Sequence, residues 1–294
     1  MKDRKFPVSD YKSKDSRWNA YYSSFDIESY LRILEYDEAT LFIDEHLGPL
    51  PKESFILDIG CGSGRHLVHL SNMGFTNLFG VDLSPHGIRN LTIRRPEIKA
   101  QVADATKLPF DDNTFEAILM VGVVYEIANV SLHDQVITEI RRVLRPGGRV
   151  VFINNSPYNF GERIFTITQT ISAFVKSSQL KFFVWRYERK DVHTLFLRHG
   201  LRLVEEWPCS IRRGVFRFFY GIFVPKNVKE NRKRRINNTN GQPYSLHEYY
   251  LVNKDRSLLT PLGNYVARIS ARVDPFLFAN TICYLFKKKA PTFK

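Results

Sequence analysis

Carboxylates and glycines gather in one stretch of this sequence, and their spacing predicts a ligand-binding turn. Asp58 is followed by three glycines at alternate positions, Gly60, Gly62 and Gly64. Glycines let a backbone turn tightly and approach a ligand closely, because they have no Cβ atom. A second carboxylate, Asp82, follows Gly64 after 18 residues and ends an apolar run. Together these residues predict a site for a nucleotide-like ligand.

An apolar run precedes each carboxylate, which predicts two strands with a helix between them. The runs cover residues 55–57 and 78–81, and the helix is expected at about residues 65–73. In such a βαβ unit the helix begins at the glycine turn and points its N-terminus at the ligand. A carboxylate at the end of the second strand can accept hydrogen bonds from both hydroxyls of a ribose.

The glycine spacing does not match the dinucleotide-binding fingerprint G-x-G-x-x-G. Counted from Gly60, the third glycine position holds Arg65. In addition, Asp58 beside the turn would repel a pyrophosphate and attract a cation. A ligand with an ammonium group, a sulfonium and a ribose therefore fits the turn better than one with two phosphates.

Residues 57–64 resemble the first motif of the class I S-adenosylmethionine-dependent methyltransferases, and residues 107–116 resemble the branch that includes quinone and small-molecule methyltransferases. By this resemblance, Asp104 would hydrogen-bond the adenine amino group, with the backbone of Ala105 beside it. The resemblance implies S-adenosylmethionine as cofactor and S-adenosylhomocysteine as product. The expected cofactor contacts are Asp58, Gly60, Cys61, Gly62, Gly64, Asp82, Leu83, Asp104, Ala105 and Val121.

The later strands and helices alternate, as in an open parallel sheet covered on both faces. Strands are expected at residues 99–103, 117–121, 150–153 and 201–205, with helices that begin at the Ser84 and Ser131 caps and at Glu188. The run 278–286, ended by lysines, resembles the last strand of many relatives. The predicted fold is α/β: a doubly wound, seven-stranded, mostly parallel Rossmann-like sheet with lid insertions and a C-terminal extension.

The chain is expected to divide into four parts. These are an N-terminal arm with cap helices (1–50), the cofactor-binding Rossmann-like domain (51–207, with a lid insertion at 156–187), a basic and aromatic insertion (208–260), and a C-terminal helix with the last strand (261–294). The lid insertion either covers the acceptor or is an extra packed helix. Likewise, Tyr21 or Tyr22 of the arm either stacks in the cofactor site or packs against the domain edge.

Methyl transfer from a sulfonium is an in-line displacement, so holding the donor and acceptor collinear supplies much of the acceleration. An acceptor hydroxyl or amine also has a proton to lose, which a carboxylate or histidine can assist. The candidates are Glu126, His133 and Tyr158. Many relatives carry a histidine near position 126, where this chain has a glutamate that either acts as base or begins a helix. The scattered histidines and cysteines match no zinc-site spacing, so no metal site is predicted.

The net charge of +13 favours an anionic partner or is a solvated basic surface. Three functions fit: methylation of an O, N or C atom of a small-molecule or lipid-like acceptor, methylation of RNA such as tRNA, or a non-catalytic cofactor-binding interaction module. The basic run at residues 232–235 supports RNA, although no RNA-binding domain signature accompanies it. The intact set of glycines and carboxylates argues against a non-catalytic module.

The cysteines and apolar runs bear on the compartment. Cys61, Cys209 and Cys283 are far apart in the sequence, which favours a reducing compartment over a disulfide framework. No apolar run reaches the roughly 18 residues that span a bilayer, and the polar N-terminus does not resemble a secretory signal. The expected location is cytoplasmic. Residues 275–286 with the lysines after them also suggest contact with an anionic membrane surface. The sequence indicates no oligomeric state.

Overall fold

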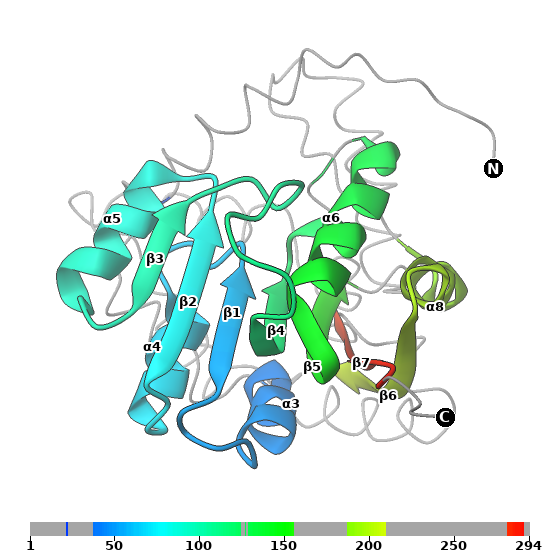
Figure 1. Cartoon of the computed structure of the whole chain (residues 1–294), viewed down its shortest axis with the longest axis horizontal. Helices are drawn as coiled ribbons and strands as arrows, with labels where there is room; N and C mark the ends of the chain where they lie inside the picture. Colours follow the sequence, from blue (N-terminus) through cyan, green and yellow to red (C-terminus); the bar gives the residue numbers. More distant parts are fainter. Residues whose placement is uncertain are drawn as a thin grey trace, which may run out of the picture.

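The computed structural model describes residues 22, 38–124, 127, 129–155, 187–209 and 281–290 of the chain. These residues form one open sheet with helices on both faces (Figure 1). The candidates Glu126 and Tyr158 lie outside the described residues. So do almost all of the arm at 1–37, the lid insertion, the basic insertion beyond Cys209, and the C-terminal helix.

The sheet has seven strands in the order β3-β2-β1-β4-β5-β7-β6. Strands β1 to β5 run parallel, and β7 is antiparallel to both of its neighbours, β5 and β6. The predicted mostly parallel, doubly wound sheet is therefore confirmed. The strands are β1 (Phe55–Ile59), β2 (Asn77–Asp82), β3 (Lys99–Val102), β4 (Phe115–Val121), β5 (Leu144–Asn155), β6 (Leu201–Cys209) and β7 (Thr281–Lys288).

The helices cover the sheet in two groups. Buried side chains of α3, α4 and α5 belong to one core cluster, and those of α6 and α8 belong to the other, on the opposite face of the sheet (Figure 1). The strand order reverses between β1 and β4, and in open α/β sheets ligands bind outside the carboxyl ends of the strands at such a point. The helices are α3 (Glu38–Leu47), α4 (Arg65–Asn72), α5 (Pro85–Arg94), α6 (Val130–Val143) and α8 (Arg189–Arg198).

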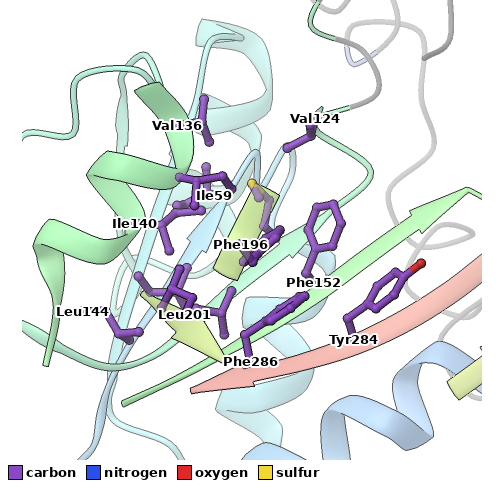
Figure 2. Close-up of a cluster of buried hydrophobic side chains, with 14 of the residues drawn as sticks. Ile59, Val124, Val136, Ile140, Leu144, Phe152, Phe196, Leu201, Tyr284 and Phe286 are labelled. Carbon is purple, nitrogen blue, oxygen red and sulfur yellow. The ribbon is translucent and has the colours of Figure 1, made fainter. Parts of the chain in front are cut away.

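Aromatic side chains fill the core under α6 and α8, as Figure 2 shows. The rings of Phe196 on α8 and Phe286 on β7 stack with their centroids 3.9 Å apart and an interplanar angle of 5°. Phe152 on β5 lies beside both Phe196 and Tyr284. This packing fixes the last strand in the interior of the sheet, between β5 and β6.

Some element boundaries differ from those expected. Strand β6 continues to Cys209, so Pro208 and Cys209 belong to the sheet and not to the basic insertion. Helix α6 begins at Val130, and its cap is Asn129 instead of Ser131, because the Asn129 side chain accepts a hydrogen bond from Ser131 N at 3.1 Å. The expected Ser84 cap of α5 is confirmed, with Ser84 Oγ accepting from Gly87 N at 3.1 Å.

The apolar residues of β7 are interior residues of the sheet. Ile282, Tyr284 and Phe286 are almost fully buried in the core. They are therefore not available to a membrane surface. The apolar character of residues 281–286 thus no longer supports the expected contact with an anionic membrane. In the described part of the chain, no helix has the length and apolar character needed to cross a bilayer.

Lys288 closes the end of helix α6. Its Nζ donates hydrogen bonds to Arg141 O at 2.7 Å, Leu144 O at 2.5 Å and Asn113 Oδ1 at 2.8 Å. The carbonyls of Arg141 and Leu144 lie at the C-terminus of α6, where backbone carbonyls lack partners within the helix and the helix dipole favours a cation. Burial lowers the pKa of Lys288, the charge of Arg141 lowers it further, and Asp112 opposes the shift.

We expect Lys288→Met to lower the free energy of unfolding by about 1–3 kcal/mol, because the buried carbonyls lose their donor. Urea denaturation monitored by circular dichroism measures this change. Lys289→Met is the matched control, since Lys289 is exposed and its replacement should leave stability within about 0.5 kcal/mol. Equal stability of the two variants would contradict the capping role.

Candidate functional site

The chain turns sharply after β1, at the glycines. Gly60, Gly62 and Gly64 have φ values of 73°, 54° and 82°, in the left-handed region that favours glycine. The N–H groups of Gly60 and Cys61 donate to Val81 O at 2.7 Å and 3.0 Å, which folds the turn across the end of β2. Gly64 is the N-cap residue of α4, and because glycine has no side chain, no side-chain hydrogen bond caps the helix there. The predicted strand, turn and helix are therefore present.

Tyr22 of the N-terminal arm lies against this turn. A Cβ atom on Gly62 would come within 2.1 Å of the Tyr22 hydroxyl. Asn90 on α5 donates a hydrogen bond from Nδ2 to Tyr22 O at 3.1 Å. Of the two arm tyrosines considered from the sequence, Tyr22 therefore reaches the glycine turn, and Tyr21 is outside the described residues.

Asp82 joins the turn to helix α5 at the end of β2. Its Oδ2 accepts from Gly62 N and its Oδ1 from Ser84 N, both at 2.8 Å. A carboxylate has about four acceptor positions, so each oxygen keeps a lone pair for a ligand hydroxyl. Burial raises the pKa of Asp82, and the two backbone hydrogen bonds oppose that rise. The side chain is thus held in one orientation.

Asp58 is a buried carboxylate at the end of β1. It is 1% exposed, and among the described residues its Oδ2 has no hydrogen-bond partner. Burial raises its pKa well above the ordinary value; the nearby Arg65 lowers the pKa and Asp82 raises it further. A buried oxygen without a partner is costly. An ammonium group of a ligand would supply the missing donor, so this site fits a positively charged amine.

The segment after β3 brings Asp104 to the same edge of the sheet. Ala103 N donates to Asp82 O at 3.1 Å, so this segment lies against the end of β2. Asp104 Oδ1 accepts from Thr106 N and from Thr106 Oγ1, each at 2.8 Å. The expected cofactor contacts thus lie at the carboxyl ends of β1 to β4. The half-buried residues among them are Gly60, Asp82, Leu83, Asp104, Ala105 and Val121.

Cys61 takes part in the turn as a packing residue. Its side chain is buried, and its Sγ lies 2.8 Å from the point that a Cβ atom on Gly80 would occupy. Burial, followed by the charges of Asp58 and Asp82, raises the pKa of the thiol. The thiol therefore stays protonated and is not a nucleophile. Its contribution to the site is the shape of the turn.

His133 is placed inside the protein. It is fully buried on α6, where its Nε2 donates to Ile127 O at 2.7 Å and its Nδ1 faces the Tyr187 hydroxyl. Because a carbonyl oxygen only accepts, Nε2 carries the hydrogen, and Nδ1 accepts from Tyr187. Both ring nitrogens are therefore engaged, and His133 connects α6 to the segment after β4. Its role as the base stays a prediction.

Asn154 is a polar residue of this edge that sequence reasoning missed. It lies on β5 and is 3% exposed, and its Oδ1 has no hydrogen-bond partner within the described part of the chain. Gly122, which follows β4, donates from its N–H to Ile153 O at 2.9 Å, so the end of β4 and Asn154 are adjacent. The sequence feature that could have identified Asn154 is an asparagine at the end of an apolar strand.

Arg142 on α6 holds the segment that follows Asp104. Its guanidinium donates to Leu108 O at 2.9 Å and Phe110 O at 2.7 Å, and it pairs with Glu139. Glu139 Oε2 in turn accepts from Leu108 N at 2.7 Å. The hydrogen bond from Arg142 lowers the pKa of Glu139. These contacts explain why the residues after Asp104 have a fixed path.

Removing the guanidinium should loosen that segment. We expect Arg142→Met to lower the free energy of unfolding by about 2–4 kcal/mol, because Glu139 and two backbone carbonyls lose a charged partner. Thermal and urea denaturation measure the effect. Arg141→Met on the same helix is the control, since Arg141 is exposed. A loss no larger than that of the control would contradict the assignment.

Comparisons with known proteins agree with this geometry. Residues 57–152 match the family model described as a methyltransferase domain. Norajmaline N-methyltransferase of Rauvolfia serpentina is 31% identical over 129 residues, which cover 42% of this chain and 43% of that protein. The ubiquinone/menaquinone biosynthesis C-methyltransferase UbiE of Desulfotalea psychrophila is 38% identical over 111 residues, covering 36% and 44%. The match thus spans less than half the length of either relative.

Solved structures share the fold. A chain from the complex that contains the Haloferax volcanii Trm112 methyltransferase activator superposes with a TM-score of 0.56 at 17% identity, over 92% of this chain and 97% of that one. Geranyl diphosphate methyltransferase in complex with S-adenosylmethionine gives 0.51 at 16% identity, over 84% and 83%. At these identities the likeness concerns the fold alone.

The fold, the glycine turn with its carboxylates and the family match define the class. Residues 57–152 form a methyltransferase domain of the class I S-adenosylmethionine-dependent superfamily. The cofactor of this superfamily is S-adenosylmethionine. The residues at the ends of β1 and β2 fit its ammonium and ribose groups.

Proposed function

We propose that this chain transfers a methyl group from S-adenosylmethionine to a small-molecule or lipid-like acceptor. The observation that carries the proposal is the pair of carboxylates around the glycine turn, one buried and one half-buried. Asp58 Oδ2 is unpartnered within the described ranges, and Asp82 is fixed by Gly62 and Ser84. This arrangement suits a ligand with one cationic end and one ribose.

Each part of the cofactor has a proposed partner. Asp58 takes the ammonium of the methionine portion, and Asp82 takes the two ribose hydroxyls. Asp104 takes the adenine amino group, with Ala105 and Leu83 beside the ring. The glycine turn leaves room for the backbone to approach the ligand. When bound, the cofactor supplies an electrophilic methyl group on a sulfonium.

The acceptor is proposed to lie over the ends of β4 and β5. Strand β4 pairs with β1, and β5 pairs with β4, on the side of β1 away from the strand that carries Asp82. Asn154 there offers an amide oxygen that lacks a donor among the described residues. An acceptor with an O–H or N–H group would supply that donor. Asn154 would then orient the nucleophile toward the methyl group, as the in-line displacement needs.

The small-molecule acceptor is favoured by the names of the relatives, which include an N-methyltransferase for norajmaline and a quinone C-methyltransferase. RNA is the second candidate, favoured by the net charge of +13. The Xenopus tropicalis tRNA methyltransferase alkbh8 also matches at 31% identity over 111 residues, covering 37% of this chain and 17% of that protein.

The test uses cofactor carrying a labelled methyl group. The purified chain is incubated with small-molecule, lipid and RNA fractions of a cell extract, with Asp82→Ala as the inactive control. We expect label in the small-molecule or lipid fraction. Label that appears in RNA and is removed by ribonuclease would favour the second candidate. No label in any fraction, despite cofactor binding, would favour a non-catalytic module.

Asn154 allows a sharper test once a labelled fraction is known. We expect Asn154→Leu to lower turnover by about 10- to 100-fold, since leaving a buried hydrogen-bond donor of the acceptor without a partner costs about 1–3 kcal/mol. The affinity for S-adenosylhomocysteine should not change, because Asn154 is proposed to contact the acceptor only. Asn154→Asp, which keeps an acceptor oxygen, should retain more activity than the leucine variant. Equal turnover in all three proteins would refute the role.

A further inference from the structure

Two buried thiols meet where β6 and β7 pair. The Sγ atoms of Cys209 and Cys283 are 3.1 Å apart, and both side chains are fully buried. In the antiparallel register Cys209 lies opposite Thr281 and Cys283 lies opposite Trp207. The two cysteines are therefore diagonal neighbours on adjacent strands. They are far apart in the sequence but close in space, and neither is in a disulfide bond in the structure.

We propose that Cys209 and Cys283 form a disulfide when the protein meets a disulfide oxidant such as oxidised glutathione. A disulfide bond is about 2.05 Å long, so the sulfur atoms need to approach by only about 1 Å. One cysteine thiolate attacks oxidised glutathione and releases one glutathione thiolate, which leaves a mixed disulfide. The second cysteine thiolate attacks the cysteine sulfur of that mixed disulfide and releases the other glutathione. Two S–H bonds are lost and one S–S bond forms, while oxidised glutathione becomes two molecules of reduced glutathione.

The third cysteine is excluded from this chemistry by its position. Cys61 lies at the end of β1, and three strands separate β1 from the edge strand β6 in the sheet. Its Sγ packs over Gly80 on β2. Cys61 therefore has no sulfur partner within the described residues. Of the three disulfides that three cysteines could form, oxidation should give the one between Cys209 and Cys283.

Access to the pair comes through the edge of the sheet. Among the described strands, β6 lies at the edge of the sheet and pairs only with β7. Edge strands open locally at lower free-energy cost than central strands. Oxidation should therefore be slow and should report the opening of β6 from β7.

The bond would close a covalent loop from residue 209 to residue 283. Such a cross-link holds the two ends of the intervening segment together in the unfolded chain as well as in the folded one, and its effect is greatest for long loops. It would also tie the edge strand to the interior strand. Oxidation of this pair would thus add a covalent bond between β6 and β7, which otherwise pair through hydrogen bonds.

Peptide mass spectrometry of the full-length protein tests the proposal. The native protein is incubated with oxidised glutathione, denatured, alkylated and digested without reductant. We expect a peptide pair joined through Cys209 and Cys283, lighter by two hydrogen atoms than the separate peptides, with Cys61 alkylated. The melting temperature should rise by about 5 °C and return to its original value with dithiothreitol.

Variants make the thermal result specific. Cys61→Ser should keep the oxidation-dependent rise, whereas Cys209→Ser and Cys283→Ser should lose it. Because either serine replacement can perturb the core, the peptide map of the unmodified sequence decides independently of them. Alkylation of both Cys209 and Cys283 after native oxidation, or a disulfide that involves Cys61, would overturn the proposal. Failure of the methyltransferase proposal would leave this result unaffected.

Discussion

Replacing Asp82 with alanine is expected to weaken the binding of S-adenosylhomocysteine by at least about 100-fold. The carboxylate is proposed to accept two ribose hydroxyls, and hydrogen bonds to a charged group contribute about 1.5–3 kcal/mol each. The loss also leaves Gly62 N and Ser84 N without the acceptor that fixes the turn. Isothermal titration calorimetry with the product measures this, because the product binds without turnover.

Two further variants separate binding from folding. Asp82→Asn keeps one acceptor oxygen and should show an intermediate loss of affinity. Asp111→Ala removes an exposed carboxylate and should bind as the unaltered protein does. Circular dichroism verifies that each variant is folded. An Asp82→Ala protein that is folded and binds within a factor of two of normal would contradict the assignment of the ribose.

Asp58 predicts opposite effects on stability and on binding. Asp58→Asn should stabilise the ligand-free protein, because it replaces a buried carboxylate that has an oxygen without a partner in the described residues by a neutral group. The same change should weaken S-adenosylhomocysteine binding by about 10-fold or more, because the amide cannot pair with the ammonium group as an ion. Chemical denaturation and calorimetry give the two quantities.

The pH dependence of binding follows from the same carboxyl group. Burial raises the pKa of Asp58 well above its usual range, so in the free protein it holds its proton to a higher pH than an exposed aspartate does. The ammonium group binds the ionised form. Affinity should therefore rise with pH between the ordinary pKa and the raised one, by up to about tenfold per pH unit. Asp58→Asn should flatten this dependence, and an unchanged slope would contradict it.

The cofactor side of the site could be predicted because its chemistry is local in sequence. The glycines at alternate positions need no partner to show that the backbone turns, and Asp82 ends a strand next to that turn. The hydrogen bonds from Gly62 N and Ser84 N to Asp82 could not be predicted, since they depend on how the turn and α5 meet in space.

The interior role of His133 was available from helical spacing. Positions 133, 136, 137 and 140 share one face of a helix, and the structure buries all four. An imidazole can act as a general base, which made His133 a candidate. Its position on the buried face of α6 follows from the helical spacing. The burial of Asn154 could be predicted in the same way. It lies two residues after Phe152 on β5, and residues two apart on a strand share one face of the sheet.

Contacts between residues that are far apart in the chain could not be predicted from the sequence. Cys209 and Cys283 are separated by 74 positions and meet only because the last strand enters the sheet between β5 and β6. Lys288 lies in a run of three lysines, yet it is buried while Lys287 and Lys289 are exposed. The alternation of a strand separates these lysines, but the helix end that Lys288 caps comes from a distant part of the chain.

The most direct test of the central claim is a calorimetric titration of the purified chain with S-adenosylhomocysteine and, separately, with a nicotinamide dinucleotide. We predict one binding site for S-adenosylhomocysteine and no heat with the dinucleotide, whose two phosphates Asp58 and Asp82 would repel. Binding of the dinucleotide without binding of S-adenosylhomocysteine, or no heat from either ligand, would contradict the account.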